Sequence, residues 1–309
     1  MSNKNYKYII DVDTGIDDAL AIILASKTLR EKVIGITTCG GNVRLEDATS
    51  NTLKVLDLAR WNVPVYAGAS KSIENSEFVH TYDYHGTNGI CDVQIETNHK
   101  PENLAADDFI IETAKKKELA FVCLATPTNL AGALKKNKEI ARNIKVVYIM
   151  GGALNVPGNQ TEYAEYNFFQ DPQAVRIVFE NIKDVRIIPL DVTNQCVISD
   201  KEAALIRVVA PVDKFIKEAI TNWYRFFGYP KKRQFELYDP LVVSAADNKD
   251  FLSFSDVKIG ISTDGMKEGE IFLNGKYSVK VAQKVRVNDF KTYLLNNLGI
   301  TTSNDIVQL

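Results

Sequence analysis

The sequence predicts an α/β fold, a single domain whose open, mostly parallel sheet carries helices on both faces. Short apolar runs rich in β-branched residues alternate with segments of helical spacing, a pattern typical of parallel sheets with helical crossovers. The strand-like runs are apolar throughout, as expected for strands that are covered on both sides. Of the 309 residues 45% are hydrophobic, enough for a large core, and one domain over residues 1–309 is the simplest interpretation.

The N-terminal third shows the alternation most clearly. Residues 7–13 (KYIIDVD) predict a strand that ends in acid, and residues 17–29 predict a helix because apolar residues recur three or four positions apart. The next strand, residues 32–42, runs into two glycines. A helix over residues 45–60 and a short strand over residues 63–68 follow.

The same alternation continues toward the C-terminus. Further apolar strand-like runs cover 119–126, 144–152 and 185–193, and helical patterns cover 107–117, 129–137 and 171–181. In residues 269–287 an Asn-Gly pair separates two β-like runs, which predicts a hairpin with a tight primed turn. Residues 288–298 predict a closing helix.

Composition and charge exclude several classes of partner. The net charge is −2, from 37 basic and 39 acidic residues, and no basic tract stands out, so we expect no nucleic-acid partner. The first residues lack the apolar segment of a secretion signal, and no apolar run approaches the roughly 18 residues of a membrane span. The widely spaced cysteines, Cys39, Cys91, Cys123 and Cys196, predict reduced, buried thiols and a cytoplasmic protein.

Four aspartates fall within eight residues, at the predicted junction of the first strand and first helix. Asp11 and Asp13 are two apart on a strand end, so their side chains point to the same side. Asp17 and Asp18 stand where the helix begins, and either one alone could simply be a helix cap. Four carboxylates this close raise one another's pKa unless a cation compensates, and a hard ion, Ca²⁺ or Mg²⁺, is the economical choice.

Two other uses of such an acidic segment fit less well. An EF-hand is excluded by spacing, because counting from Asp11 places Ile16 at position six and Ile22 at position twelve. The DVDTG segment is also similar to the D-x-D motif of haloacid dehalogenase-type phosphatases. That class needs a late acidic motif with glycine, which this sequence lacks.

The whole segment DVDTGIDDALAI, residues 11–22, resembles the signature of the nucleoside hydrolases, the inosine–uridine-type ribohydrolases. The other family landmarks follow in the same order and cover nearly the whole chain. They are ITTCGGN (36–42), HGTNGI (85–90), the long central motif (148–175) and YDPLVVSAA (238–246). The resemblance implies the Rossmann-like nucleoside hydrolase fold and Ca²⁺-dependent hydrolysis of the N-glycosidic bond of ribonucleosides.

Matching the motifs residue by residue also implies a set of site residues. The Ca²⁺ ligands would be Asp13, Asp18, the backbone carbonyl of Thr126, and Asp239. The residues that hold the ribonucleoside would be Asp17, Asn159, Glu165 and Asn167, with Asn42 nearby among the catalytic residues and His85 lining the site. Asp11 would orient the cluster. Members of the family usually form homodimers or homotetramers.

The chemistry of glycosidic bond cleavage explains why these residue types are needed. Cleaving a ribose–base bond passes through an oxocarbenium-like sugar, which an acidic pocket favours. The metal would lower the pKa of a bound water, and a carboxylate would take its proton. The resemblance places Asp13 on both metal and water, so Asp13 is the expected base.

One position departs from the family pattern and bears on substrate choice. Where the family often has histidine before Asp-Pro, this sequence has Tyr238, whose ordinary pKa is roughly 10. Tyr238 is expected to donate a proton or to stack. Purine-specific branches of the family place an aromatic residue at this position, so the resemblance implies a purine or purine-like base. The missing histidine also leaves open a catalytically weak nucleoside-binding protein.

A second segment also bears on substrate binding. Residues 224–233 are aromatic and basic, and they predict a flap over the base or, equally, a helix end packed into the core. The contacts from a flap would be Tyr224, Phe227, Tyr229 or Arg233.

Overall fold

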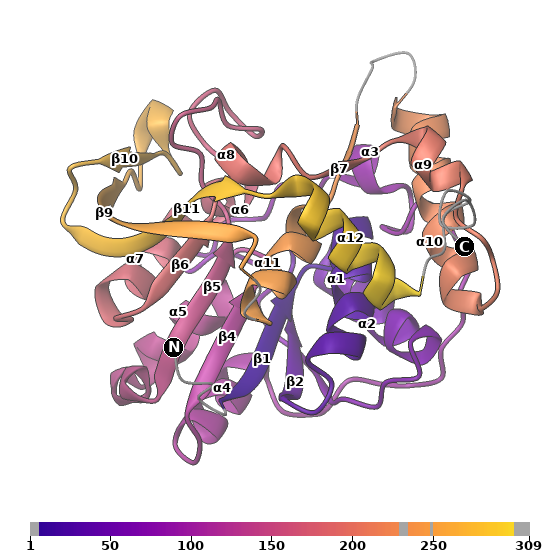
Figure 1. Cartoon of the computed structure of the whole chain (residues 1–309). Helices are drawn as coiled ribbons and strands as arrows, with labels where there is room; N and C mark the ends of the chain where they lie inside the picture. Colours follow the sequence, from indigo (N-terminus) through magenta and orange to yellow (C-terminus); the bar gives the residue numbers. More distant parts are fainter. Residues whose placement is uncertain (1–5, 229–233, 248–249, 300–309) are drawn as a thin grey trace.

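The computed structural model describes residues 6–228, 234–247 and 250–299 (Figure 1). Nine strands of these ranges form one sheet in the order β10-β9-β11-β6-β5-β4-β1-β2-β3. Their bounds are β1 (Lys7–Val12), β2 (Val33–Thr38), β3 (Val65–Ala67), β4 (Leu119–Cys123), β5 (Ile144–Met150), β6 (Val185–Ile188), β9 (Leu252–Ile261), β10 (Ile271–Leu273) and β11 (Tyr277–Val285).

The sheet is open and mostly parallel, as the sequence predicts. Strands β1 to β6 have the doubly wound order 3-2-1-4-5-6, and β11 continues parallel to β6. Strand β9 pairs antiparallel with both of its neighbours. The strand order reverses between β1 and β4, and ligands of such sheets bind at this reversal, outside the carboxyl ends of the strands.

Helices cover both faces of the sheet (Figure 1). Alternate residues of β1 point to opposite faces, so Ile10 packs with one helical layer and Ile9 with the other, and both are fully buried. The first layer contains α1 (Ile16–Thr28), α2 (Leu45–Leu58), α10 (Pro211–Trp223), α11 (Tyr238–Ala246) and α12 (Val287–Leu298). The second contains α4 (Ala106–Ala114), α5 (Thr128–Lys136) and α7 (Pro172–Asn181).

The predicted hairpin around Asn274 and Gly275 is wrong. Strands β10 and β11 do not pair with each other, because β9 lies between them. The chain crosses the end of β9 instead, so closely that a Cβ on Gly275 would lie 2.0 Å from the backbone nitrogen of Gly260. A residue without a side chain is therefore required at this crossing.

Replacing Gly275 by alanine is expected to destabilise the protein by about 1–3 kcal/mol, because the new methyl group must push two backbones apart. The matched control is Gly132→Ala inside α5, where a Cβ would meet only an ordinary contact at 3.7 Å from Asp107 Oδ2. That substitution is expected to stabilise by about 0.5–1 kcal/mol. Urea denaturation of the two variants measures both effects, and equal midpoints would contradict the crossing.

Two further expectations concern membranes and thiols. No helix in the described ranges is both long and apolar enough to cross a membrane. The four cysteines are all buried, which confirms the prediction that these thiols are internal.

Candidate active site

A cavity of about 410 Å³ lies at the reversal point of the sheet. Its acidic lining comes from segments that are far apart in the sequence: the first turns of α1 and α11, α3 (Tyr82–His85), β8 (Phe235–Glu236), and the residue before α6 (Tyr166–Gln170). Among the described residues no lysine or arginine lines it. The five acids on its wall are Asp17, Asp83, Glu165, Glu236 and Asp239. An acidic wall of this kind suits a cationic ligand or a developing positive charge.

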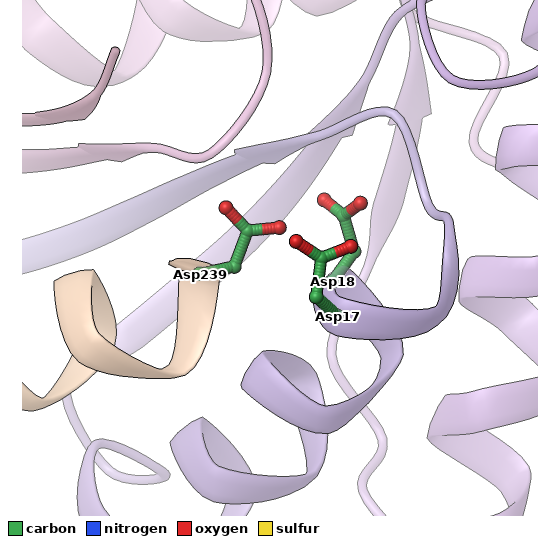
Figure 2. A group of neighbouring side chains, drawn as sticks. All are labelled: Asp17, Asp18 and Asp239. Atoms are coloured by element: carbon green, nitrogen blue, oxygen red, sulfur yellow. The ribbon is translucent and has the colours of Figure 1, made fainter. Parts of the chain in front are cut away.

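Three carboxylates converge beside the cavity (Figure 2): Asp17 and Asp239 line it, and Asp18 is fully buried. Asp17 and Asp18 project from the start of α1, and Asp239 faces them from the start of α11, with one oxygen of each within 4.8 Å of the others. Burial raises the pKa of Asp18 to about 6, and burial together with the charge of Asp18 raises that of Asp17 to about 8. Burial and the charge of Asp17 hold the pKa of Asp239 well above its usual range.

The two carboxylate oxygens of Asp18 differ in their hydrogen bonds. Its Oδ2 accepts the backbone N–H of Gly15 at 3.0 Å, which resembles a helix cap, and the side-chain amide of Asn42 at 3.3 Å. Its Oδ1 is buried and has no hydrogen-bond partner. An orphaned carboxylate oxygen beside two other acids is costly unless something cationic meets it, so helix capping alone does not account for Asp18.

Asp13 lies next to this group at the end of β1. Its Oδ2 accepts the backbone N–H of Asn42 at 2.6 Å, and its Oδ1 accepts the Asn42 side-chain amide at 3.3 Å. Asn42 therefore bridges Asp13 and Asp18. Burial, followed by the charge of Asp18, raises the pKa of Asp13 well above its usual range. The loop approaches so closely that a Cβ on Gly41 would lie 2.0 Å from Asp13 Oδ2.

Asp11 does not line the cavity, and neither do Asp13 and Asp18; what sets Asp11 apart is that its Oδ1 is held by two hydrogen bonds from the framework. It is fully buried, and its Oδ1 accepts the hydroxyl of Thr37 at 2.5 Å and the amide of Asn129 at 2.8 Å. A phosphatase of the D-x-D type would need this side chain as an exposed nucleophile. The position of Asp11 therefore disfavours that interpretation.

Thr126 is buried just beyond the end of β4. Its backbone carbonyl accepts the N–H of Thr128 at 2.8 Å and the thiol of Cys39 at 3.9 Å, and its hydroxyl oxygen has no partner.

The central motif places three predicted substrate-binding residues on the cavity wall. Glu165 caps α6: its carboxylate accepts the backbone N–H groups of Gly152 at 3.0 Å, Asn167 at 2.9 Å and Phe168 at 3.1 Å. Burial outweighs these bonds and raises its pKa to about 7. Asn167 donates its amide to the carbonyls of Leu124 and Met150, which orients the side chain.

Asn159 lines the cavity as well. Its side-chain oxygen accepts the backbone N–H of Tyr166 at 2.8 Å. That bond fixes the amide group at the N-terminus of α6, so its N–H donors remain for a ligand.

His85 serves the fold and the cavity together. It ends the short helix α3 (Tyr82–His85), and its Nδ1 accepts the backbone N–H of Ile16 at the start of α1, at 3.2 Å. Burial lowers the pKa of His85 to about 3, so the ring is neutral at neutral pH and carries its proton on Nε2. The residue also lines the cavity, where Nε2–H is a hydrogen-bond donor.

Tyr238 begins α11 and lines the cavity beside Asp239. Its hydroxyl donates to Oδ1 of Asn194 at 3.0 Å, and burial raises its pKa well above 10. The hydroxyl proton of Tyr238 is thus hydrogen-bonded to Asn194. In the segment that predicts a flap, Tyr224 is buried and donates to the carbonyl of Ile198 at 2.6 Å, whereas Tyr229 and Arg233 lie outside the described residues.

Sequence reasoning missed several residues on the cavity wall, Tyr84 and Glu236 among them. The hydroxyl of Tyr84 donates to Oε2 of Glu236 at 2.7 Å, and the two residues are 152 positions apart in the sequence. Each stands beside a matched motif, Tyr84 directly before HGTNGI and Glu236 two positions before YDPLVVSAA, but no local pattern pairs them.

The fold and the site define a class: a hydrolase of glycosidic bonds on a doubly wound sheet, with carboxylates gathered where the strand order reverses. The chain belongs to the inosine-uridine preferring nucleoside hydrolase family, which it matches over residues 8–292. It is accordingly an N-ribohydrolase that acts on ribonucleosides.

Relatives and solved structures agree on the family and differ in the base that their names specify. Uridine nucleosidase 1 of Arabidopsis thaliana is 29% identical, over 88% of this chain and 82% of that protein. A pyrimidine-specific ribonucleoside hydrolase of Escherichia coli is 34% identical, over 75% and 72%. The structure of a purine-preferring ribonucleoside hydrolase from Gardnerella vaginalis has a TM-score of 0.87 and 32% identity, and the match covers 94% of this chain and 98% of that one.

Proposed function

We propose that this enzyme hydrolyses the N-glycosidic bond of ribonucleosides in a Ca²⁺-dependent reaction, and that a purine or purine-like base is favoured. The observation that carries the proposal is the convergence of Asp17, Asp18 and Asp239 with an orphaned oxygen on Asp18. Three carboxylates within 4.8 Å, with raised pKa values and no basic side chain on the described wall, form a donor set that suits a hard cation.

We assign the candidate cation ligands from the family resemblance together with the positions of the side chains. Asp18 and Asp239 are supported by the resemblance and by their convergence. Asp13 is supported by the resemblance and by Asn42, which bridges it to Asp18, and the Thr126 carbonyl by the resemblance alone. Asp17 converges with them and also lines the cavity, which suits a ligand to ribose hydroxyls. When bound, Ca²⁺ would lower the pKa of a water molecule and hold it against the sugar.

Residues of the chain would transfer the proton, bind the ribose and stabilise the developing charge. Asp13, steadied by Asn42, would take the proton from the attacking water. Asp17, Asn159, Glu165 and Asn167 would grip the ribose, so that binding energy acts at the reacting carbon. The negative wall of the cavity would stabilise the positive charge that develops on the sugar as the bond to the base breaks.

The preference for a purine rests on the lack of an obvious proton donor for the departing base. The Tyr238 hydroxyl is committed to Asn194, and its pKa is raised well above 10. A purine carries a basic ring nitrogen that can be protonated by water, whereas uracil has no comparable nitrogen. A site with a weak acid beside the base therefore favours purines, with Tyr238 supplying an aromatic surface.

Tyr238→Phe is expected to lower kcat/KM for inosine by less than about tenfold, because the lost hydrogen bond to Asn194 is worth about 0.5–1.5 kcal/mol. Tyr238→Ala also loses stacking of about 1–3 kcal/mol and should cost clearly more. Steady-state kinetics on both variants check this. A phenylalanine variant as slow as the alanine variant would assign the tyrosine hydroxyl a chemical role.

The test of the function is a panel of inosine, guanosine, adenosine, uridine and cytidine, incubated with the protein and Ca²⁺ while released ribose is measured. We expect ribose from at least one purine nucleoside. Saturable binding without any ribose would favour the nucleoside-binding alternative. Faster cleavage of uridine and cytidine than of every purine nucleoside would overturn the base preference alone.

Three wider properties stay predictions. We propose that residues 1–309 form one catalytic domain, which the nine-stranded sheet supports because it joins strands from both ends of the described chain. Four free thiols favour the cytoplasm. Assembly into a homodimer or homotetramer is carried over from the family resemblance.

A further inference from the structure

One peptide group connects His80 to Asp13, the proposed base. It is the peptide between Gly41 and Asn42: its N–H donates to Asp13 Oδ2 at 2.6 Å, and its carbonyl oxygen accepts the Nδ1–H of the His80 ring at 2.8 Å. A carbonyl oxygen can only accept, so the proton of the second hydrogen bond lies on Nδ1. A trans peptide is planar, and its N–H and C=O point in opposite directions. By holding the oxygen, His80 therefore sets the direction of the N–H that meets Asp13.

This peptide lies directly against the carboxylate. A Cβ on Gly41 would come within 2.0 Å of Asp13 Oδ2, so the backbone approaches more closely than a residue with a side chain allows. The next carbonyl of the loop, that of Asn42, accepts the backbone N–H of Thr81 at 2.9 Å. Residues 80 and 81 thus hold two successive carbonyls of the loop. A small rotation of the loop would change the position of the Asp13 oxygens.

Residues 79–81 are themselves anchored to α6, whose first turn lines the cavity. Gln170, at the end of α6, accepts the backbone N–H of Val79 at 3.0 Å through Oε1 and donates from Nε2 to the Val79 carbonyl at 2.6 Å. The Tyr166 hydroxyl donates to the same carbonyl at 2.5 Å. Gln170 and Tyr166 are buried, whereas Val79 is 46% exposed, so these hydrogen bonds rather than packing fix Val79. His80 therefore projects from a segment that is held in place.

We propose that His80 is a positioning residue that fixes the orientation of the Asp13 carboxylate through the Gly41–Asn42 peptide. The inference rests on the proposed function, because that function makes Asp13 the base. A base must lie within hydrogen-bond reach of the proton that it takes, and misplacement by about 1 Å can cost about 10²-fold in rate. His80 itself does not line the cavity, so its effect reaches the substrate through the base.

The experiment compares two substitutions of similar shape that differ in the donor. His80→Leu removes the ring N–H, and we expect kcat at saturating Ca²⁺ to fall about 10–100-fold. KM should change little, because the residues that grip the ribose keep their own hydrogen bonds. His80→Asn carries an N–H donor bonded to Cγ, as Nδ1 is in histidine, and should restore most of the lost kcat. Ribose release is measured in steady state and in single turnover, per folded molecule as determined by circular dichroism.

His99→Leu is the matched control. His99 also has a polar partner for its Nδ1, Asp57 Oδ1 at 2.5 Å, but it does not line the cavity. Its kcat and KM should stay at the wild-type values. Should His80→Leu not fold, His80→Asp replaces it, because ionised aspartate has the shape of asparagine and no N–H to donate.

The inference is overturned if His80→Leu keeps the wild-type kcat, or if His80→Asn is as slow as His80→Leu. A rise in KM with unchanged kcat would likewise overturn it, since that result assigns His80 to substrate binding. A lower melting temperature with an unchanged rate per folded molecule would reduce His80 to a role in stability.

Failure of this inference is distinguishable from failure of the proposed function. If wild-type protein releases no ribose from any nucleoside of the panel in the presence of Ca²⁺, the proposed function itself fails. If wild-type protein releases ribose and His80→Leu is equally fast, only the role of His80 is lost.

Discussion

Asp13→Asn is expected to lower kcat for ribose release by about 10²–10⁴-fold, the range that a general base usually contributes. The physical reason is that asparagine keeps the size of the side chain and can still accept the Asn42 backbone N–H, which Asp13 Oδ2 accepts at 2.6 Å. It cannot take a proton from water. Single-turnover measurement of ribose release separates this chemical defect from any change in product release.

The same variant should leave the fold intact. Burial and the charge of Asp18 hold the pKa of Asp13 well above its usual range, so the ionised form opposes folding at neutral pH and its loss should not lower the melting temperature of the metal-free protein. Asp256→Asn on the exposed side of β9 is the control for a lost charge and should keep full activity. A near-normal rate for Asp13→Asn would remove Asp13 from the role of base.

Removal of Ca²⁺ with a chelator is expected to abolish turnover and to lower the melting temperature, and added Ca²⁺ should restore both. At a free ion concentration a hundredfold above Kd, binding stabilises the folded state by about 2.7 kcal/mol. For a chain of this size that corresponds to a shift of roughly 4 °C. Calorimetry with and without the ion measures the shift.

Two variants and a second ion sharpen this test. Asp18→Asn and Asp239→Asn should lose most of the Ca²⁺-dependent shift, because each removes a charge from the three-carboxylate group. Mg²⁺ should stabilise less than Ca²⁺, since it demands strict octahedral geometry and gives up its waters reluctantly. A wild-type melting temperature that does not respond to either ion would contradict the metal site.

Much of the fold could be predicted because the relevant signals are local. The strand-like runs are apolar throughout, and β1, β4 and β5 are buried along nearly their whole length. Asp171 before Pro172 predicts the start of a helix, and its Oδ1 does accept the backbone N–H of Ala174 at 3.0 Å in α7. Capping and periodicity act over a few residues, so the sequence displays them directly.

The misses have a common physical cause, which is contact between distant segments. Asn274-Gly275 has the composition of a hairpin turn, but β9 takes the place between β10 and β11. The Tyr84–Glu236 pair joins segments that no local pattern connects. The motifs did indicate that carboxylates would gather at the first strand end, but they could not reveal that Asn42 would bridge Asp13 and Asp18.

The gathering of acids from both ends of the chain has a consequence for biosynthesis. Asp17 and Asp18 leave the ribosome early, whereas Asp239, which faces them, emerges only when most of the sheet has been made. A growing polypeptide therefore carries mutually repelling charges that no cation can yet bridge. Under the proposed calcium dependence, Ca²⁺ would stabilise only a chain that already includes α11. Fragments that end before α11 would lack this stabilisation and would be degraded more readily by proteases.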